Sequence, residues 1–357
     1  MIQNFFLQFG RTFVLLLTLA SLFIFVSCTP NTNKRSFTFI YNVELEPSNG
    51  KKIELWLPVP QSNEVQKISK LNIKCEDLSY EIKDEQKHNN KYVYIYSNDG
   101  ISKNTMVTMT FNVERYEHQN INCPAVDPSK YLGASALVPT GKIFNSIIQE
   151  NKLNNNDLKG LYDFVLSGMH YGKPESKDNQ YYKEPWLSSK DTYGLKKVSR
   201  DKVVELYKKA KATDGSYTFG NGNSLYACDI GVGNCTDYHS YFISLSRTME
   251  IPARFHMGFS IPDEKEGKVE GYHCWADYYV EGGGWYPVDI SEADKDPEKI
   301  DYFFGNIFYN RVEMIVGRDF KLEGYEEETI NLFIYPLLEI DDIKSDSFKK
   351  SFSYKNL

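Results

Sequence analysis

The sequence is short of several features that would assign a chain of 357 residues to a common class. Positive charge is in deficit, with 41 Lys and Arg residues against 48 Asp and Glu residues, which disfavours a nucleic-acid partner. The cysteines form no C-x-x-C pair, so a structural zinc site gains little support. We find no internal repeat and no low-complexity tract. What remains is a globular composition, in which aromatic residues make up 15% and favour sheet-rich packing.

A hydrophobic run opens the chain, but it is too short to span a bilayer comfortably. Arg11 precedes an apolar stretch over residues 12–26, which is the pattern of a secretory signal peptide. The stretch ends in Val26-Ser27-Cys28 and resembles a bacterial lipobox, in which cleavage before the cysteine leaves its thiol to be lipidated. We therefore expect a signal peptide over residues 1–27, lipidation of Cys28 and a tether over residues 28–35. The protein would be an exported lipoprotein, anchored to the membrane at the cell envelope or surface. An ordinary signal peptide with an incidental cysteine is the alternative.

Apolar residues recur with a period of two through the next part of the chain. The pattern holds over residues 37–45, 53–59 and 107–113 and predicts strands with one buried face. Ser48-Asn49-Gly50 provides a turn between the first two strands. We therefore expect an N-terminal β-sandwich-like domain over residues 36–118, without a cluster of residues that would carry chemistry.

Beyond Pro124 the apolar spacing changes to that of helices. A helical period runs from Leu158 to Met169, and Asp157 is placed to cap the first turn. Residues 173–200 have little periodicity and indicate an inserted loop before a helix over residues 201–211. The expected divisions of this part are a second domain over residues 125–340 and a frayed C-terminal tail over residues 341–357.

One cysteine lies where a helix should begin. Gly231-Val232-Gly233-Asn234 forms a flexible turn before Cys235, and the residues that follow have helical apolar spacing. The unpaired amides and the dipole of a helix N-terminus stabilise an anion, which lowers the pKa of a thiol and raises its thiolate fraction. The same amides can bind a developing oxyanion. Cys235 is therefore a candidate nucleophile.

A hairpin further along the chain brings a histidine and a carboxylate together. The segments from His273 to Val280 and from Trp285 to Asp289 are joined by Gly282-Gly283-Gly284. If Trp275 opposes Asp289, the side chain of His273 lies diagonally opposite Asp289, on the same face and within reach. A symmetric loop over residues 281–284 would break this register. We therefore predict a connection of three or five residues, or a bulge.

The motifs follow one another in an order that occurs in a known family. G-x-C at a helix start is followed by I-P-A-R, H-x-W and G-W-x-x-V-D, all between Gly231 and Asp289. In this order the chain resembles the transglutaminase-like superfamily, whose fold is papain-like. W-L-P-V-P at Trp56 to Pro60, with D-I-S-E-A from Asp289, resembles bacterial exported members that carry a β-domain in front. The resemblance implies an α+β fold in which the helix with the cysteine packs on an antiparallel sheet.

The resemblance also implies a catalytic triad, with Cys235 as nucleophile, His273 as general base and acid, and Asp289 as the group that orients the imidazole. The chemistry of these side chains supports the same roles. Such an enzyme transfers an acyl group from an amide to its cysteine, and water or an amine then resolves the thioester. We favour hydrolysis of a peptide or isopeptide, so the expected partner is a protein or peptide substrate.

The resemblance leaves the outcome of the reaction open. A protein-glutamine transglutaminase that cross-links amines is one alternative, and a catalytically inactive cell-surface binding or scaffold protein is another. No cofactor is expected. Calcium binding, known in animal transglutaminases, is not carried over, because no matching acidic loop is evident.

Several residues near the motifs admit two interpretations each. His239, one helical turn after the candidate nucleophile, is a rival base, although a hydrogen bond within the core is favoured. Asp277 shares a strand face with the hairpin histidine and is an alternative orienting carboxylate. Trp275 and Trp285 are candidates for a substrate groove, but such residues beside a hairpin are more often core. His256 is expected at the surface or behind the site.

The cysteines give an odd count once the lipobox residue is set aside. An exported location permits disulfides, and one of the five remaining thiols should stay free. We expect Cys228 and Cys274, which flank the candidate nucleophile in sequence, to pair. With Cys235 left free, three disulfide arrangements are possible for the other four residues, Cys75, Cys123, Cys228 and Cys274. A less favoured alternative is a zinc site formed by Cys228, Cys235, His239 and His273.

Overall fold

The computed structural model describes residues 33–123, 125–173, 186–187, 219–327 and 329–357. Residues 33–357 belong to one compact unit. The expected signal peptide over residues 1–27 and the lipidation site Cys28 lie outside the described residues. In the part of the chain that is described, no helix is long and apolar enough to cross a membrane.

The first part of the described chain consists of strands. They are β1 (Lys34–Leu45), β2 (Ile53–Val59), β3 (Gln66–Cys75), β4 (Ser79–Glu85), β5 (Asn90–Ser97) and β6 (Thr105–Tyr116). In β1 the side chains of Phe37, Phe39 and Tyr41 are fully buried while their neighbours are half-buried, as a strand with one core face requires. The strands predicted from the period of two are thus confirmed, although β2 is buried on both faces and not on one.

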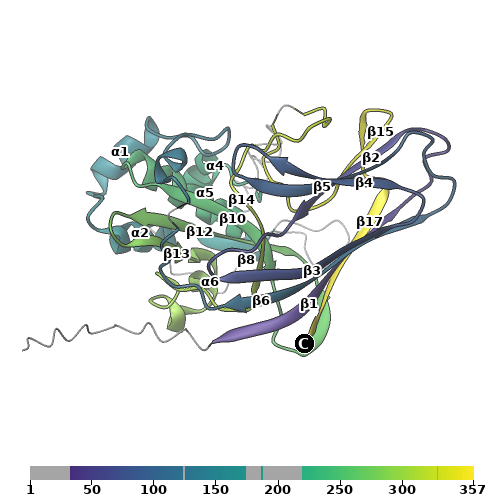
Figure 1. The fold of residues 1–357 in the computed structure, drawn as a ribbon. Coiled ribbons are helices and arrows are strands. Elements are labelled where there is room, and N and C mark those ends of the chain that lie inside the picture. Colours follow the sequence, from purple (N-terminus) through teal and green to yellow (C-terminus); the bar gives the residue numbers. More distant parts are fainter. Residues whose placement is uncertain (1–32, 124, 174–185, 188–218, 328) are drawn as a thin grey trace, which may run out of the picture. The chain divides into compact units, whose positions relative to one another are not determined.

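Four later strands complete the same sheets (Figure 1). They are β11 (Glu266–Val269), β15 (Leu337–Ile340), β16 (Ile343–Ser345) and β17 (Phe348–Asn356). One antiparallel sheet has the order β11-β17-β1-β6-β3 and the other has the order β16-β15-β2-β5-β4. The N-terminal β-domain therefore includes strands from far beyond residue 118. The described chain is not divided into separate compact units between residues 118 and 125.

The expectation of a frayed tail over residues 341–357 is wrong. Strand β17 pairs with β1 along its whole length, from Phe348 opposite Leu45 to Asn356 opposite Phe37. Phe352 and Tyr354 are buried, whereas most of the polar residues around them are exposed, namely Lys349, Lys350, Ser351 and Lys355. Only these two side chains mark the buried face of the strand. The many charged and polar residues of this segment therefore hide its period of two in the sequence.

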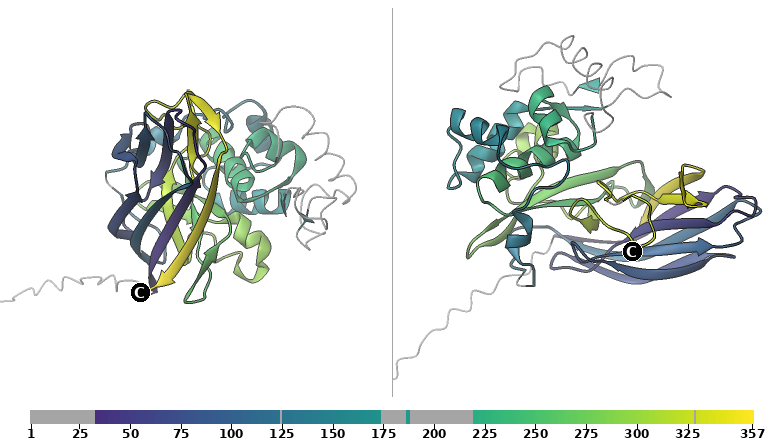
Figure 2. Two further views of the ribbon diagram at one scale, coloured as in Figure 1. Left: turned by 90° about the vertical axis from the view of Figure 1, so that its right-hand side faces the viewer. Right: turned by 90° about the horizontal axis from the view of Figure 1, so that it is seen from above.

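The second part is a four-stranded antiparallel sheet with helices against it. Its strands, in the order β13-β12-β10-β14, are β13 (Gly284–Val288), β12 (Tyr272–Val280), β10 (Ala253–Ser260) and β14 (Arg311–Val316). The helices are α1 (Ile143–Glu150), α2 (Leu158–Gly168), α4 (Ser224–Ile230), α5 (Cys235–Thr248) and α6 (Ile290–Lys295), with short 3-10 turns at Pro128–Tyr131 and Pro297–Lys299. Helix α5 packs against β10 and β12, and the helices gather on one side of the sheet (Figure 2). The α+β prediction is confirmed.

Smaller predictions for this part have mixed outcomes. Helix α2 begins where expected, and the Asp157 side chain accepts a hydrogen bond from the Gly160 amide at its first turn. The predicted loop over residues 173–200 and helix over residues 201–211 fall almost wholly outside the described residues. A small sheet joins β7 (His170–Lys173), β8 (Trp186–Leu187) and β9 (Val232–Gly233).

The hairpin of β12 and β13 has the predicted register. Val280 opposes Gly284 and Ala276 opposes Val288, so three residues, 281–283, form the connection. Continuing this register would place Asp289 opposite Trp275 and diagonal to His273, as the sequence predicts. The chain leaves the sheet after Val288, and Asp289 becomes the N-cap of α6.

Candidate active site

The candidate nucleophile lies at a tightly constrained helix start. Asn234 caps α5: its side chain accepts a hydrogen bond from the Thr236 amide, and the Asp237 carboxylate accepts one from the Asn234 amide. A Cβ atom on Gly233 would lie 2.4 Å from the Asp237 Cβ, so this capping arrangement requires glycine. Cys235 is the first residue of the helix, as predicted.

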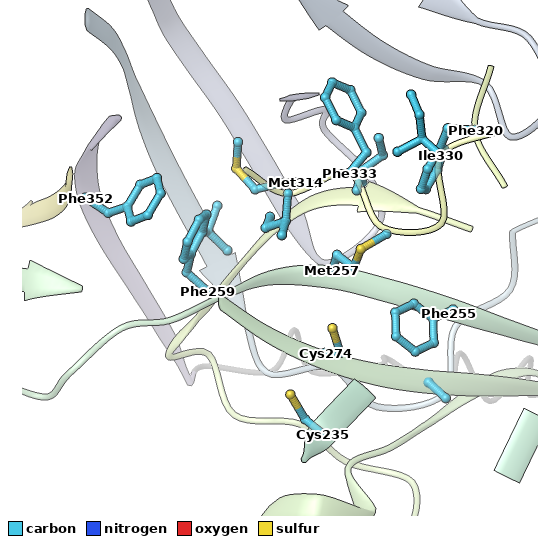
Figure 3. Close-up of a cluster of buried hydrophobic side chains, with 14 of the residues drawn as sticks. Cys235, Phe255, Met257, Phe259, Cys274, Met314, Phe320, Ile330, Phe333 and Phe352 are labelled. Atoms are coloured by element: carbon cyan, nitrogen blue, oxygen red, sulfur yellow. The ribbon is translucent and has the colours of Figure 1, made fainter. Parts of the chain in front are cut away.

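A second thiol lies against Cys235. Figure 3 shows Cys274, from β12, beside Cys235 at the start of α5, and both side chains are buried. A hydrogen bond from Cys274 is the strongest influence on Cys235 and holds the pKa of its thiol well below the ordinary range, although burial acts in the opposite direction. Burial, followed by the same hydrogen bond, raises the pKa of Cys274 well above its ordinary range. The negative charge of the pair therefore resides on Cys235.

The expected pairing of Cys228 with Cys274 is wrong, because all five described cysteines are free thiols. Cys228 lies on α4, where it contacts Tyr241, whereas Cys274 faces Cys235 from the sheet. The alternative zinc site is also wrong, because Cys228 lies apart from the other three proposed ligands. Among the described residues, no set of metal-ligating side chains with converging donor atoms includes Cys228.

His273 is held by a buried carboxylate. Its Nε2 donates a hydrogen bond to Asp289 Oδ2 over 2.6 Å. Burial alone would lower the pKa of His273, but Asp289 outweighs burial and the pKa rises to about 9. The ring also hydrogen-bonds to Cys235, and because Nε2 is engaged, Nδ1 is the atom left for the thiol. A thiol with a depressed pKa beside an imidazole with a raised pKa forms a thiolate–imidazolium pair at neutral pH.

Asp289 is fixed from several directions. Its Oδ1 accepts hydrogen bonds from the Ser291 hydroxyl (2.9 Å) and the Glu292 amide (3.1 Å), and its Oδ2 accepts one from Arg311 Nη2 (3.2 Å). Burial alone would raise the pKa of Asp289, but the positive charges of His273 and Arg311 hold it well below its ordinary range. Arg311 comes from β14, and no local sequence signal indicates this role.

His239 lies beside the triad but has no free ring nitrogen. Its Nδ1 donates to the Cys235 carbonyl over 2.6 Å, and its Nε2 accepts a hydrogen bond from the Ile290 amide over 3.0 Å. Burial lowers the pKa of His239, so the ring is neutral. It therefore ties the first turn of α5 to the segment that carries Asp289, which agrees with the favoured interpretation of a hydrogen bond within the core.

Asp277, the alternative orienting carboxylate, does not contact the hairpin histidine. It accepts a hydrogen bond from Arg254 Nε over 2.9 Å and forms an ion pair with His256 Nε2 at 3.0 Å. His256 is 2% exposed and lies between Asp277 and Glu313, whose Oε2 is 2.8 Å from its Nδ1. A position at the surface, one of its two expected locations, is therefore wrong. Its two carboxylate partners make burial of the ring tolerable.

The two tryptophans lie in the core and line no groove. Both are fully buried. Trp275 stacks between the rings of His256 (5.7 Å between centroids) and His273 (6.3 Å). Trp285 packs against the Arg254 guanidinium, 4.0 Å from its ring centroid. Trp275 therefore supports the catalytic histidine candidate from behind, and the groove interpretation fails for both residues.

Glu292 adds a second acidic group to the site, which sequence reasoning missed although the residue lies in the D-I-S-E-A motif. Its Oε1 is 3.9 Å from His273 Nδ1 and 2.8 Å from Lys295 Nζ. Donor atoms of His273, Asp289 and Glu292 lie within 4.8 Å of one another, as a metal site would require. A cation there would face Arg311, which already neutralises Asp289, so the arrangement suits proton transfer better.

The contact between the two thiols predicts a shift in reactivity. In the Cys274→Ala variant the donor to the thiolate is lost, so the pKa of Cys235 should rise and its alkylation by iodoacetamide should need higher pH. The midpoint of the pH–rate curve measures this, and Cys274→Ser, which retains a donor, should lie between the variant and the wild type. Cys228→Ala is the control and should leave the midpoint unchanged. An identical midpoint in Cys274→Ala and wild type would contradict the assigned hydrogen bond.

Comparison with known proteins is consistent with this geometry. A family model described as the transglutaminase-like superfamily matches residues 188–290, which include Cys235, His273 and Asp289. An uncharacterised protein of Haemophilus influenzae is 25% identical over 366 residues, with 89% of each chain covered.

Two crystal structures are also similar. A protein of Cytophaga hutchinsonii, provisionally named a cysteine protease, has a TM-score of 0.49 and 14% identity, and the match covers 91% of this chain and 99% of that one. The periplasmic domain of TgpA from Pseudomonas aeruginosa, bound to ethylmercury, has a TM-score of 0.32 and 14% identity, with 74% and 93% covered. From the family match, the chain carries a transglutaminase-like superfamily domain over residues 188–290.

Proposed function

We propose that the protein is a cysteine hydrolase that cleaves a peptide or isopeptide amide, with Cys235 as nucleophile, His273 as acid and base, and Asp289 as the orienting group. The observation that carries the proposal is the buried hydrogen bond of 2.6 Å from the His273 ring to the Asp289 carboxylate, together with a Cys235 thiol whose pKa is held well below its ordinary range by Cys274 and His273. Each group has the protonation state that its role needs, because Cys235 is depressed in pKa and His273 is raised.

The reaction begins from the thiolate–imidazolium pair. The sulfur of Cys235 attacks the amide carbonyl carbon, and the carbonyl electrons move to the oxygen to give a tetrahedral oxyanion. When the carbon–nitrogen bond breaks, the His273 imidazolium gives its proton to the leaving amine. A water molecule then gives a proton to the neutral imidazole and attacks the thioester, which releases the carboxylic acid and restores Cys235.

The start of α5 supplies electrostatic support for the oxyanion. Cys235 is the first residue of this 14-residue helix, so the positive end of the helix dipole lies at the reacting sulfur. Donors fixed in a water-poor site stabilise charge that develops in the transition state. Hydrolysis is preferred over cross-linking because water requires no second binding site for an amine.

Purified full-length protein should release ammonia or a peptide from glutamine-containing and isopeptide-linked substrates faster than it incorporates a fluorescent primary amine into them. Cys235→Ala should lower the rate by at least about a thousandfold, and His273→Ala should slow both turnover and alkylation of Cys235. Cys228→Ala is the matched control, with turnover expected near that of the wild type.

The outcomes separate three classes of protein. Amine incorporation that exceeds release would replace the hydrolase proposal with a cross-linking transglutaminase. A thiol-directed electrophile that labels all cysteines equally, or that spares Cys235, would instead favour a catalytically inactive binding or scaffold protein.

The raised pKa of His273 predicts the basic limit of activity. Above about pH 9 the imidazolium is deprotonated and cannot protonate the leaving amine, so kcat/KM should fall as pH rises through this value. Asp289→Asn removes the charge that raises the pKa of His273, so the basic limb should move to lower pH. Asp277→Asn is the control, because Asp277 does not contact His273, and its basic limb should match that of the wild type. An unmoved limb in Asp289→Asn would contradict the assigned orienting role.

We also propose that the protein is an exported lipoprotein held at the membrane through Cys28. The support is the sequence alone, namely the apolar stretch that ends in Val26-Ser27-Cys28. In a bacterial host that lipidates exported proteins, wild-type protein should incorporate an alkyne-labelled fatty acid and sediment with membranes. Cys28→Ser should lose the label. Equal labelling of Cys28→Ser and wild type would overturn this proposal.

A further inference from the structure

The sulfur of Cys274 takes no part in the chemistry proposed above, although it lies against the proposed nucleophile. Figure 3 shows the side chains of Cys235 and Cys274 next to each other, one at the start of α5 and the other on β12. The two thiols are close enough to share a hydrogen bond. The other described cysteines lie on different segments, which are the end of β3 (Cys75), the chain after β6 (Cys123) and α4 (Cys228).

The two thiols differ in how readily each meets an oxidant. The pKa of Cys235 is held well below its ordinary range, chiefly by the hydrogen bond from Cys274, and a thiolate is the form of cysteine that peroxides oxidise. Cys274 is fully buried, and burial is the main reason that its pKa lies well above the ordinary range. An oxidant that enters the site therefore reacts first at Cys235.

The surroundings of Cys274 change once Cys235 is oxidised. After burial, the largest causes of its raised pKa are the hydrogen bond to Cys235 and the negative charge of Cys235. Oxidation removes that charge from the Cys235 sulfur. The Thr236 hydroxyl still donates to the Cys274 sulfur over 3.7 Å, and it acts with the positive charge of Arg318 to lower the pKa of Cys274. Cys274 therefore becomes the better nucleophile just when Cys235 becomes an electrophile.

We propose that Cys235 and Cys274 form a reversible disulfide when the protein meets a hydroperoxide, and that this bond inactivates the enzyme. The proposal rests on the proposed function, in which Cys235 is the nucleophile and small molecules must reach its sulfur. A sulfenic acid without a neighbouring thiol is oxidised further to a sulfinic acid, which ordinary thiols do not reduce. The thiol of Cys274 thus stores the nucleophile in a recoverable form.

The chemistry takes place in two steps. The Cys235 thiolate attacks one oxygen of the hydroperoxide, the O–O bond breaks, and the departing oxygen takes the proton of the His273 imidazolium and leaves as an alcohol or water. The Cys274 sulfur then attacks the sulfur of the resulting sulfenic acid. The S–O bond breaks, and the hydroxyl group leaves as water with the proton of the Cys274 thiol. Two electrons pass from the sulfurs to the peroxide, and a dithiol returns them by thiol–disulfide exchange.

Treatment of the full-length protein with excess hydrogen peroxide tests the proposal. Digestion without reductant, followed by mass spectrometry, should find two peptides joined through Cys235 and Cys274. Dithiothreitol should then restore about nine-tenths of the alkylation of Cys235 by iodoacetamide, whereas in Cys274→Ser the sulfur proceeds to a sulfinic acid and recovery should be at least about fivefold lower. Cys228→Ala is the matched control, because it removes a thiol from α4, and it should recover as the wild type does.

A trivalent arsenical tests the contact without any variant. Phenylarsine oxide bonds to two neighbouring thiols and releases water, so in the reduced wild type it should block the alkylation of Cys235. Glutathione, a monothiol, should not reverse this block, whereas dithiothreitol should.

The readouts follow the chemical state of Cys235 and not turnover, so they separate this proposal from the hydrolase proposal. The disulfide proposal is overturned if no peptide pair joins Cys235 to Cys274, if Cys274→Ser recovers as fully as the wild type, or if glutathione releases the arsenical. It is also overturned if disulfide-bonded protein cleaves amides as fast as reduced protein. Reduced protein that forms the disulfide but cleaves no amide would overturn the hydrolase proposal alone.

Discussion

The buried contact between the His273 imidazole and the Asp289 carboxylate is the interaction on which the rest of the site depends. Neither group tolerates burial as an isolated charge, and each makes burial of the other possible. Arg311 adds a second positive charge, and the cap of α6 supplies two more donors. The carboxylate is therefore anchored by the fold itself, and the imidazole it holds keeps a proton that a free histidine would lose near neutral pH.

Three further constraints keep this contact in place beside the thiol. The three-residue connection of the β12–β13 hairpin sets the register that brings Asp289 to the face of His273. His239 links the Cys235 carbonyl to the Ile290 amide, so the helix that carries Cys235 and the segment that carries Asp289 cannot separate independently. Trp275 supports the imidazole through ring stacking. Together these contacts preorganise the side chains of the site. A reacting group must be held within about half an ångström of its productive position.

The same sheet carries a second set of buried charges. Arg254, His256, Asp277 and Glu313 form a compensated network, and Trp275 stacks between its histidine and that of the triad. Such networks require nearly complete pairing, because a low dielectric magnifies the cost of each unpaired group. Arg115 and His118, whose side chains have no hydrogen-bond partner among the described residues, are exceptions to this pairing.

The sequence by itself determined the features that depend on residues near one another in the chain. Apolar residues with a period of two located β1, β2 and β6, and apolar residues with helical spacing located α2. A glycine turn located the start of α5, and the hairpin register placed His273 beside Asp289. The tertiary structure alone decided that Cys274 meets Cys235 instead of Cys228, that Arg311 reaches Asp289, and that β17 completes the sheet of β1. Local patterns record which face of an element is buried. They do not record which distant element covers that face, because that choice is made by packing of the whole chain.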